Sequence, residues 1–265
     1  MARTRKAELI DARRLSPSVR GLRFRTADGG PVGHVPGQYL DLVVPTARGL
    51  PFRRSYSIAS APDPADPGAF EVAVTLVEEG PTSRALHDLP IGGTVEVEAV
   101  RGTFVRTHAD RGHPALFVAA GTGLAPIRAM LAEEIGRDLG GHVGREIGAG
   151  LAPADGRAQG VSSERPPLVL LFGCRTPEDL LWGDELRAWE RACPRFRLHV
   201  TLSRPPAGWS GLTGHVQRHA TRLAGSVPGA RAYVCGLSAM VDDVVALLAR
   251  DAGLSREALR YETYD

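Results

Sequence analysis

The stretch Phe117-Val118-Ala119-Ala120-Gly121-Thr122-Gly123-Leu124-Ala125-Pro126 decides the fold class of this chain. An apolar run of strand character ends in a glycine turn, and the residues after the turn have helical character. Open amides and the positive end of a helix dipole meet at such a turn, so it attracts an anion. Pro126 suits the first turn of a helix. The stretch therefore predicts a strand, an anion-binding turn and a helix.

The same alternation continues to the end of the chain. Apolar or β-branched runs and candidate helices follow one another after residue 110. Continuous apolar strands of this kind are buried on both faces of a sheet. The expected strands cover 116–120, 168–172, 197–202 and 232–235, and the expected helices cover 126–135, 178–192, 213–223 and 238–252. The pattern predicts a parallel sheet with helices on both faces, which forms an α/β domain over residues 111–265.

Residues 136–166 interrupt this second domain. They contain eight glycines and several polar or proline residues. A stretch of this length without secondary structure is unusual inside a compact domain. We expect a mobile insertion that follows the first helix of the α/β domain.

Short β-like runs separated by turn signals characterise residues 1–110. Glycine and proline clusters at 29–30, 62–68 and 92–93 punctuate these runs. The expected strands cover 19–24, 39–44, 54–59, 70–76 and 94–100, and one short helix covers 83–88. Thr82 or Ser83 is placed to cap that helix and to leave backbone amides facing a phosphate. The pattern predicts an antiparallel barrel or sandwich.

The composition limits the classes of partner that the protein can have. The chain has 265 residues, 43% of them hydrophobic, and a net charge of +2, so nothing points to nucleic acid or a membrane as a partner. Residues 1–25 carry eight basic and two acidic side chains, which suits either a steering face for an acidic protein or an ordinary solvated strand. An apolar run of about 18 residues and a signal peptide are both missing, so we expect a soluble protein.

The cysteines indicate a reducing compartment. Cys174, Cys193 and Cys235 are odd in number and too widely spaced for a metal or iron–sulfur pattern. We expect no disulfide framework and no metal, and a cytoplasmic protein.

Two polar motifs in the first domain suit a flavin nucleotide. Arg54-Ser55-Tyr56-Ser57 supplies a fixed cation with five donors, a flat amphipathic ring and small hydroxyls. These groups match a phosphate, an aromatic ring system and a ring nitrogen. In Gly80-Pro81-Thr82-Ser83, the glycine lets the backbone approach a phosphate closely.

Further motifs follow in a fixed order: Gly121-Thr122-Gly123-Leu124-Ala125-Pro126, Val234-Cys235-Gly236 and Tyr261-Glu262-Thr263-Tyr264. Together with the flavin motif they resemble the ferredoxin–NADP reductase family, whose motifs are Arg-x-Tyr-Ser and Gly-Thr-Gly-x-Ala-Pro. The resemblance covers roughly residues 7–264. It implies a six-stranded antiparallel barrel that binds FAD over residues 1–110, and an α/β domain that binds NAD(P) over residues 111–265.

The resemblance implies a role for each residue of the flavin motifs. Arg54 binds the flavin diphosphate, Tyr56 lies against the isoalloxazine, and Ser57 hydrogen-bonds near N5, with Ser55 between them in the motif. Gly80, Thr82 and Ser83 match the Gly-x-x-Ser element that clamps the pyrophosphate of FAD. That match favours FAD over FMN.

The resemblance also places catalytic residues. Cys235, followed by Gly236, matches the cysteine beside the nicotinamide C4 atom, and Glu262 matches a carboxylate that positions nicotinamide and exchanges protons. Tyr264 matches the tyrosine that covers the flavin until nicotinamide displaces it. Asp265 departs from the plant-type pattern, in which the chain stops at the tyrosine, and a frayed C-terminus is the alternative. The expected catalytic residues are Ser57, Cys235, Glu262 and Tyr264, while Cys174 and Cys193 are expected to be structural.

The nucleotide is expected to bind along the second domain. Gly121, Thr122, Gly123 and Pro126 belong to the turn that faces the dinucleotide pyrophosphate. Three further residues, Arg175, Ser203 and Arg204, follow expected strands and suit an adenosine 2′-phosphate. NADPH is favoured, but NADH stays open because NADH-using relatives also have Ser-Arg-Pro and a downstream tryptophan, as at Trp209.

The resemblance implies a monomeric ferredoxin–NAD(P) reductase. Hydride passes from NAD(P)H to flavin N5, and single electrons leave to a separate ferredoxin or flavodoxin that supplies an oxygenase or a cytochrome P450. Three alternatives stay open: an NAD(P)H:flavin reductase that releases reduced flavin, an electron-transfer subunit of a larger redox complex, and a nucleotide-binding sensor without catalysis.

Overall fold

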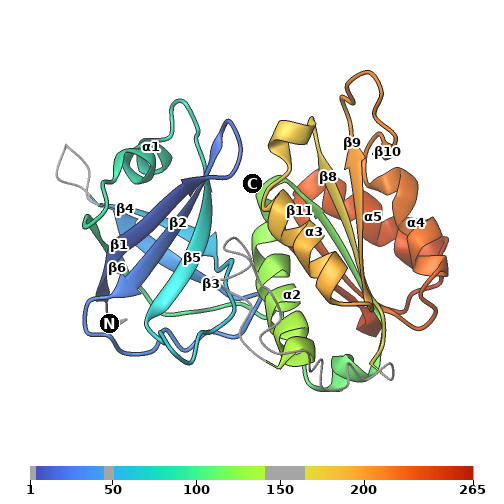
Figure 1. The fold of residues 1–265 in the computed structure, drawn as a ribbon, viewed down its shortest axis with the longest axis horizontal. Coiled ribbons are helices and arrows are strands. Elements are labelled where there is room, and N and C mark those ends of the chain that lie inside the picture. The colour runs from blue at the N-terminus through green and yellow to red at the C-terminus, as the bar shows by residue number, and fades with distance from the viewer. Residues whose placement is uncertain (1–3, 45–50, 141–164, 265) are drawn as a thin grey trace.

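Two β-sheets lie side by side in the computed structural model, which describes residues 4–44, 51–140 and 165–264 (Figure 1). A barrel formed by the first part of the chain stands next to a parallel sheet that is covered by helices. The C-terminal strand ends between the two, beside the barrel. The predicted two-part architecture is confirmed, whereas the expected boundary near residue 110 stays a prediction.

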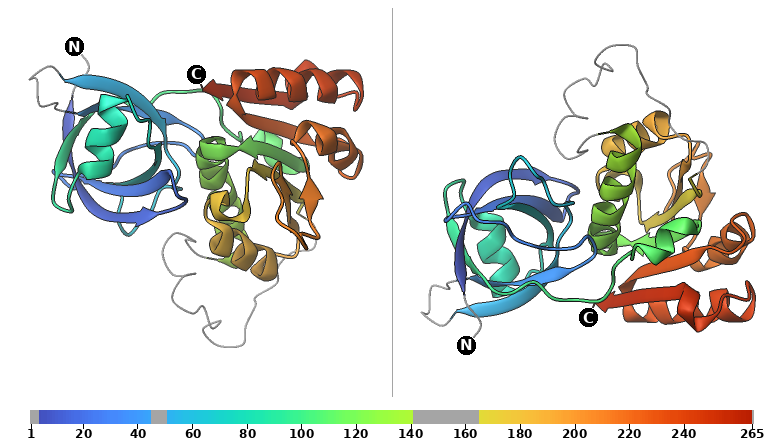
Figure 2. Two further views of the ribbon diagram at one scale, coloured as in Figure 1. Left: turned by 90° about the horizontal axis from the view of Figure 1, so that it is seen from above. Right: turned by 90° about the horizontal axis from the view of Figure 1, so that it is seen from below.

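Six described strands form the barrel, in the order β4-β3-β6-β1-β2-β5 and with antiparallel pairing throughout. They are β1 (Arg5–Arg14), β2 (Val19–Thr26), β3 (Tyr39–Val44), β4 (Phe52–Ser57), β5 (Ala69–Thr75) and β6 (Thr94–Val97). A bridge between Ile58 and Val72 joins the two edges, so the barrel is nearly closed. Inward-facing side chains such as Leu22, Leu40 and Val95 fill it. The short helix α1 (Pro81–Asp88) lies across one end (Figure 2).

The second sheet is parallel, with the order β10-β9-β8-β7-β11-β12 among the described strands. These are β7 (Ala115–Ala120), β8 (Leu168–Cys174), β9 (Phe196–Leu202), β10 (Leu212–Thr213), β11 (Arg231–Leu237) and β12 (Leu259–Tyr264). The connecting α-helices are α2 (Leu124–Leu139), α3 (Gly183–Ala192), α4 (Gln217–Gly225) and α5 (Ser238–Arg250), with short 3-10 turns η1 (Ala109–Gly112), η2 (Gly121–Gly123), η3 (Pro177–Asp179) and η4 (Arg256–Ala258).

Helices cover both faces of this sheet, as the sequence predicts (Figure 2). Ile127 of α2 and Trp189 of α3 belong to one buried cluster with Phe117 of β7. The helices α4 and α5 pack on the opposite face, where Val244 is buried with Val118. The layer of α2 and α3 faces the barrel, so α2 lies at the junction of the two sheets.

Several element boundaries differ from the sequence predictions. The expected helix over 178–192 is wrong in its first turn, because Trp182 has a left-handed backbone with φ of 50° and α3 begins only at Gly183. The expected helix over 213–223 starts late, since Leu212 and Thr213 pair with β9 and α4 begins at Gln217. The expected strand over 54–59 begins earlier, at Phe52, and ends at Ser57.

The glycine-rich segment also begins later than expected. α2 continues through Gly136 to Leu139 and ends at Gly140, which takes a left-handed φ of 71°. Residues 136–139 are therefore helical and do not belong to an insertion. Residues 141–164 lie outside the described residues.

Candidate active site

Ser57, at the end of β4, meets the last strand of the chain. Its Oγ donates to Glu262 Oε1 at 3.0 Å and lies 2.7 Å from the Tyr264 hydroxyl oxygen. Cys235 lies opposite Glu262 in the pairing of β11 with β12, and Tyr264 packs against the buried cluster that contains Cys235. Three separate segments thus bring together the four residues that we expect to be catalytic.

Burial favours the protonated forms of this cluster. Burial raises the pKa of the Cys235 thiol far above its usual range, and it also raises the pKa of the Tyr264 hydroxyl. Burial also raises the pKa of the Glu262 carboxyl, although hydrogen bonds from Ser57 and Tyr264 oppose part of this effect. The arrangement can hold a proton on Glu262 next to the Ser57 hydroxyl.

β4 presents two different faces, as the alternation of a strand requires. On one face, Ser55 Oγ donates to Asp41 Oδ1 at 2.6 Å and Arg53 Nε donates to Asp41 Oδ2 at 3.0 Å. On the other face, Arg54 is exposed, and within the described residues its guanidinium bonds only the Arg53 carbonyl oxygen. Burial raises the pKa of Tyr56 to about 12, so its hydroxyl stays neutral. Arg54 therefore offers a cation to an incoming anion, whereas the hydroxyl of Ser55 is already bonded to Asp41.

The start of α1 leaves polar groups open. Gly80 is its N-cap residue and no side chain caps the helix, so the expectation of a Thr82 or Ser83 cap is wrong. Ser83 Oγ accepts from the Val77 N–H at 3.1 Å and donates to the Gly80 carbonyl at 3.0 Å, which braces the preceding loop. The buried Thr82 hydroxyl has no partner in the described residues. An open helix N-terminus and a buried, unpaired hydroxyl suit an anion.

The turn between β7 and α2 approaches Cys235 closely. A Cβ atom added to Gly123 would lie 2.3 Å from the Cys235 carbonyl oxygen, a separation that side chains do not tolerate. Gly121 takes a left-handed φ of 55°, and Thr122 lies between the two glycines in η2. Pro126 is in the first turn of α2, which has no side-chain cap. Because both glycines are needed for this geometry, the anion-binding turn lies directly against the strand that carries the thiol.

Two exposed arginines follow neighbouring strands at the carboxyl edge of the sheet. The Ser203 N–H donates to the Cys174 carbonyl at 3.0 Å, and the Arg204 N–H donates to the Arg175 carbonyl at 2.8 Å. The loops after β8 and β9 are thereby tied together. Neither Arg175 nor Arg204 has an ion pair with a described residue. The two side chains offer unpaired positive charge at one edge of the sheet.

Comparison with known proteins identifies the family. Residues 6–105 match the model of the oxidoreductase FAD-binding domain, and residues 146–246 match that of the oxidoreductase NAD-binding domain. The chain is 37% identical to ferredoxin–NADP reductase B of Sorangium cellulosum (strain So ce56), over 98% of this chain and 97% of that one. The chain belongs to the ferredoxin–NADP reductase family. It is an oxidoreductase that uses FAD and NAD(P)H.

Oxygenase-system reductases are also similar to this family member. The ferredoxin–NAD(P)+ reductase component of the naphthalene 1,2-dioxygenase/salicylate 5-hydroxylase systems of a Ralstonia species is 29% identical over 88% of this chain. The chain spans only 60% of that protein's length. Among solved structures, the FAD/NAD-binding domain of nitric oxide dioxygenase from Vibrio cholerae O1 biovar El Tor has a TM-score of 0.78 at 20% identity, and each chain covers 98% of the other. That likeness shows the fold.

The described residues of this reductase fit both cofactors. Arg54, the Thr82 hydroxyl and the uncapped start of α1 supply a cation, a donor and open amides for a flavin diphosphate. The turn at η2 supplies the same kind of open amides for a dinucleotide. No group of three or more side chains able to hold a metal ion occurs in the described parts of the chain. Within the same ranges, no helix has the length and apolar character needed to cross a bilayer.

Sequence reasoning missed Asp41, which organises the outer face of β4. Only 4% of this residue is exposed, and it accepts from Ser55, Arg53 and Arg101. An acid inside the apolar run Tyr39–Val44 was the available signal, because a buried carboxylate needs partners. Arg101 could not be placed beside it from sequence, since the two residues lie on separate segments of the barrel.

Proposed function

We propose that this reductase takes a hydride from NADPH onto bound FAD and passes electrons singly to a separate ferredoxin or flavodoxin. The contact of Ser57 with Glu262 and Tyr264 supports this proposal most directly. It joins the flavin motif on the barrel to the last strand of the nucleotide-binding sheet. FAD, when bound, accepts a hydride and releases its two electrons one at a time.

The flavin side of the proposal assigns a task to each open group. Arg54, the amides that follow Gly80 and the Thr82 hydroxyl hold the diphosphate, while Ser83 keeps the loop in place. The neutral Tyr56 ring lies against the isoalloxazine, and Ser57 donates a hydrogen bond at N5. Hydride addition would place negative charge on the N1–C2 side of the ring, so fixed donors on that side would stabilise the reduced form.

The nucleotide side uses the buried cluster. Gly121, Thr122, Gly123 and Pro126 receive the dinucleotide pyrophosphate, and Cys235 with Gly236 borders the nicotinamide. The Cys235 thiol stays neutral, so it contributes shape and excludes water without placing a charge near the hydride. Glu262 holds a proton that Ser57 can relay. Tyr264 covers the flavin until nicotinamide takes its place.

NADPH is the nucleotide that the free arginines favour. Arg175 and Arg204 lie on loops that are hydrogen-bonded to each other, and neither is neutralised by a described carboxylate. A 2′-phosphate provides the charge that two such guanidinium groups attract. Ser203 adds a hydroxyl on the same loop.

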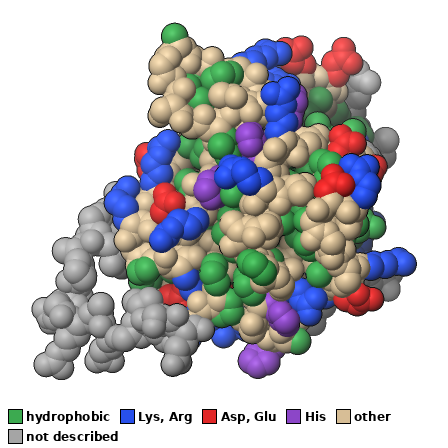
Figure 3. Space-filling view, turned by 90° about the vertical axis from the view of Figure 1, so that its right-hand side faces the viewer, with side chains coloured by type: hydrophobic (Ala, Val, Ile, Leu, Met, Phe, Trp, Pro, Cys, Tyr) green, Lys and Arg blue, Asp and Glu red, His purple; other side chains and the backbone are tan. Residues whose placement is uncertain are grey.

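The acceptor is proposed to be a separate protein of the ferredoxin or flavodoxin class. The chain has only three cysteines, at positions 174, 193 and 235, so it lacks the four-cysteine pattern of a plant-type iron–sulfur cluster. Among the described arginines of the first two strands, Arg5 pairs with Asp28 at 2.6 Å and Arg25 pairs with Asp66 at 2.6 Å. On the outer face of the α/β domain, basic, acidic and apolar side chains are mixed (Figure 3).

Anaerobic cytochrome c reduction tests the acceptor. With NADPH as donor, we expect the rate to be slow for the reductase alone and to rise steeply when a [2Fe–2S] ferredoxin or a flavodoxin is added. Free FAD is the matched control addition. If free FAD accelerates the reaction as strongly as either protein, the enzyme releases reduced flavin and the proposed acceptor is wrong.

A further inference from the structure

Arg128 of α2 is buried at the junction between the barrel and the α/β domain, with 2% of its surface exposed. Its Nη1 donates to the Ala59 carbonyl at 2.6 Å and lies 3.4 Å from Glu71 Oε2, both on the barrel side. Its Nε and Nη2 donate to the two carboxylate oxygens of Glu185 on α3, at 3.0 Å and 2.9 Å. One guanidinium is thus hydrogen-bonded both to the barrel and to α3 of the α/β domain.

Two more side chains complete this arrangement, which we name the junction clasp: Arg13, Glu71, Arg128, Trp182 and Glu185. The Arg128 guanidinium lies 4.8 Å from the centre of the Trp182 ring, and Trp182 Nε1 donates to Glu71 Oε1 at 3.2 Å. Arg13 Nη2 donates to the same Glu71 oxygen at 3.0 Å. The clasp contains two arginines and two glutamates, so its charges balance.

Apolar side chains pack around the buried part of the clasp. Small barrel residues Ala59, Ala61 and Ala73 belong to the same buried cluster as Ile127 and Leu131 of α2. α2 faces the barrel in each view (Figures 1 and 2). Buried ion pairs add little net stability, because desolvation offsets most of their attraction. Their directional hydrogen bonds do fix how two surfaces are oriented. Apolar packing alone fixes that orientation less strictly.

The clasp is connected to the proposed active site by short stretches of chain. Ala59 comes two residues after Ser57, and Arg128 comes two residues after Pro126 of the pyrophosphate turn. The Ala59 N–H also donates to the Glu71 carbonyl at 2.7 Å, which fixes the chain after Ser57 on β5. A displacement at Arg128 therefore changes the position of the nucleotide turn relative to Ser57.

We propose that Arg128 is a positioning residue for hydride transfer, which holds the nucleotide-binding helix in register with the flavin strand. This inference rests on the proposed function, because it concerns the geometry of that hydride step. Reacting groups that are misplaced by about 1 Å lose on the order of 10²-fold in rate. Loss of the clasp should therefore slow hydride transfer without weakening the binding of either cofactor.

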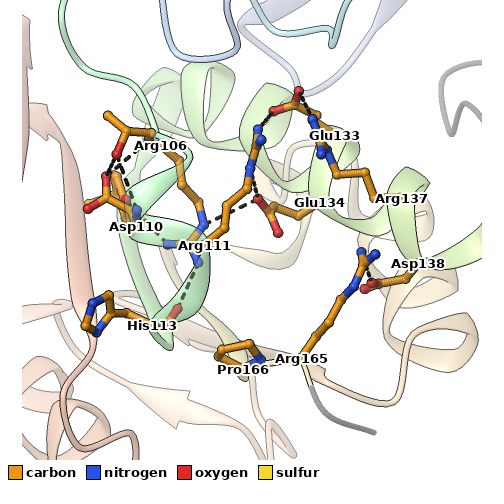
Figure 4. A network of polar contacts seen from close by, with 12 residues as sticks. Arg106, Asp110, Arg111, His113, Glu133, Glu134, Arg137, Asp138, Arg165 and Pro166 are labelled. Atoms are coloured by element: carbon orange, nitrogen blue, oxygen red, sulfur yellow. Dashed lines mark hydrogen bonds and ion pairs between the residues drawn. The ribbon is translucent and has the colours of Figure 1, made fainter. Parts of the chain in front are cut away.

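A second ionic network binds the C-terminal half of α2, and one of its residues provides a control variant for Arg128. Arg111 pairs with Glu133 at 2.7 Å and with Glu134 at 3.0 Å, and Arg106 lies 3.4 Å from Glu134 (Figure 4). These contacts join α2 to the segment that precedes β7, and none of them involves Arg128. Arg137 is on the same helix but is exposed, and its ion pair is with Glu133 of its own helix. Arg137→Gln is therefore the matched control.

The experiment is anaerobic stopped-flow reduction of the FAD-loaded protein by NADPH and by its C4-deuterated form. The variants are Arg128→Met, Arg128→Lys and the double variant Glu71→Gln/Arg128→Met. Arg128→Met leaves the buried Glu71 and the half-buried Glu185 with Arg13 as their only cation, and this alone can prevent folding. The double variant retains Glu185 with Arg13, 3.8 Å apart, so its charges stay balanced and it decides the test if Arg128→Met does not fold.

We expect the limiting rate of flavin reduction to fall about tenfold to hundredfold in Arg128→Met and in the double variant. FAD content and the NADPH concentration for half-saturation should stay near those of wild type, a deuterium isotope effect should persist, and Arg128→Lys should recover part of the rate. A limiting rate in the double variant equal to that of Arg137→Gln would overturn the proposal. If wild type itself is reduced by neither NADPH nor NADH, the proposed function fails, and the positioning role fails with it.

Discussion

Glu262 shows how burial acts on a single carboxyl at the residue scale. Burial raises its pKa, and the Ser57 hydroxyl donates to it at 3.0 Å. A carboxyl whose pKa is higher in the folded protein than in the unfolded chain binds its proton more tightly when folded. Its contribution to stability is therefore most favourable below the unfolded pKa, and it is lost as the pH rises through the folded pKa.

Glu262→Gln should consequently stabilise the folded protein at neutral pH, because the amide stays neutral at every pH. The difference in melting temperature, variant minus wild type, should be positive at pH 7 and should shrink as the pH is lowered. Thermal unfolding followed by circular dichroism across this range gives the difference directly. A difference that does not change with pH would show that Glu262 titrates normally in the folded state.

Arg54 and Arg53 allow a second test at the residue scale, because neighbouring residues of a strand face opposite ways. Arg54→Ala should weaken FAD binding by about tenfold to hundredfold, since charge-assisted hydrogen bonds contribute about 1.5–3 kcal/mol each. Arg53→Ala removes the ion pair with Asp41 at 3.0 Å but should leave FAD binding near the wild-type level. Fluorescence titration of the apoprotein with FAD measures both. Equal losses in the two variants would remove Arg54 from the proposed diphosphate site.

At the scale of elements, the turn η2 fixes how closely α2 approaches β11. Gly123→Ala would put a Cβ atom 2.3 Å from the Cys235 carbonyl oxygen, so the turn or the strand must move. We expect a loss of about 1–3 kcal/mol in the free energy of unfolding, typical of overpacking. Gly112→Ala is the matched control, because its Cβ would meet no atom within 4 Å. Urea unfolding compares the two, and equal midpoints would show that the close contact is not rigid.

The elements also show where sequence reasoning succeeds. The apolar runs that became β7, β8 and β11 were predicted nearly to the residue, because strands buried on both faces leave an unbroken apolar signal. β9 was predicted within one residue, although its Arg197 is exposed. β1 was not predicted: basic and acidic side chains occupy its outward positions and obscure the alternation. β12 is an edge strand in which Tyr261 and Thr263 are exposed, and only its pairing with β11 makes it a strand. The start of α3 depends on the left-handed Trp182, which propensity does not predict.

At the scale of the whole molecule, the site is assembled from distant parts of the chain. Ser57 and Glu262 are 205 positions apart, yet their side chains are hydrogen-bonded. The motifs predict the residues of the candidate site, and the structure brings Ser57, Glu262 and Tyr264 together. The junction clasp could not be predicted, since Arg128, Glu71 and Glu185 belong to no motif. Their contacts depend on how the two sheets dock, and that follows from packing over the full interface. The barrel and the α/β domain therefore each contribute side chains to the candidate site.

Anaerobic reduction of the purified protein by NADPH and, separately, by NADH tests this account most directly, with flavin absorbance as the signal. We predict that FAD copurifies with the protein and is bleached rapidly by NADPH and more slowly by NADH. A colourless protein that reduces only added flavin would contradict the retained cofactor. A coloured protein that neither nucleotide bleaches would contradict the hydride step itself.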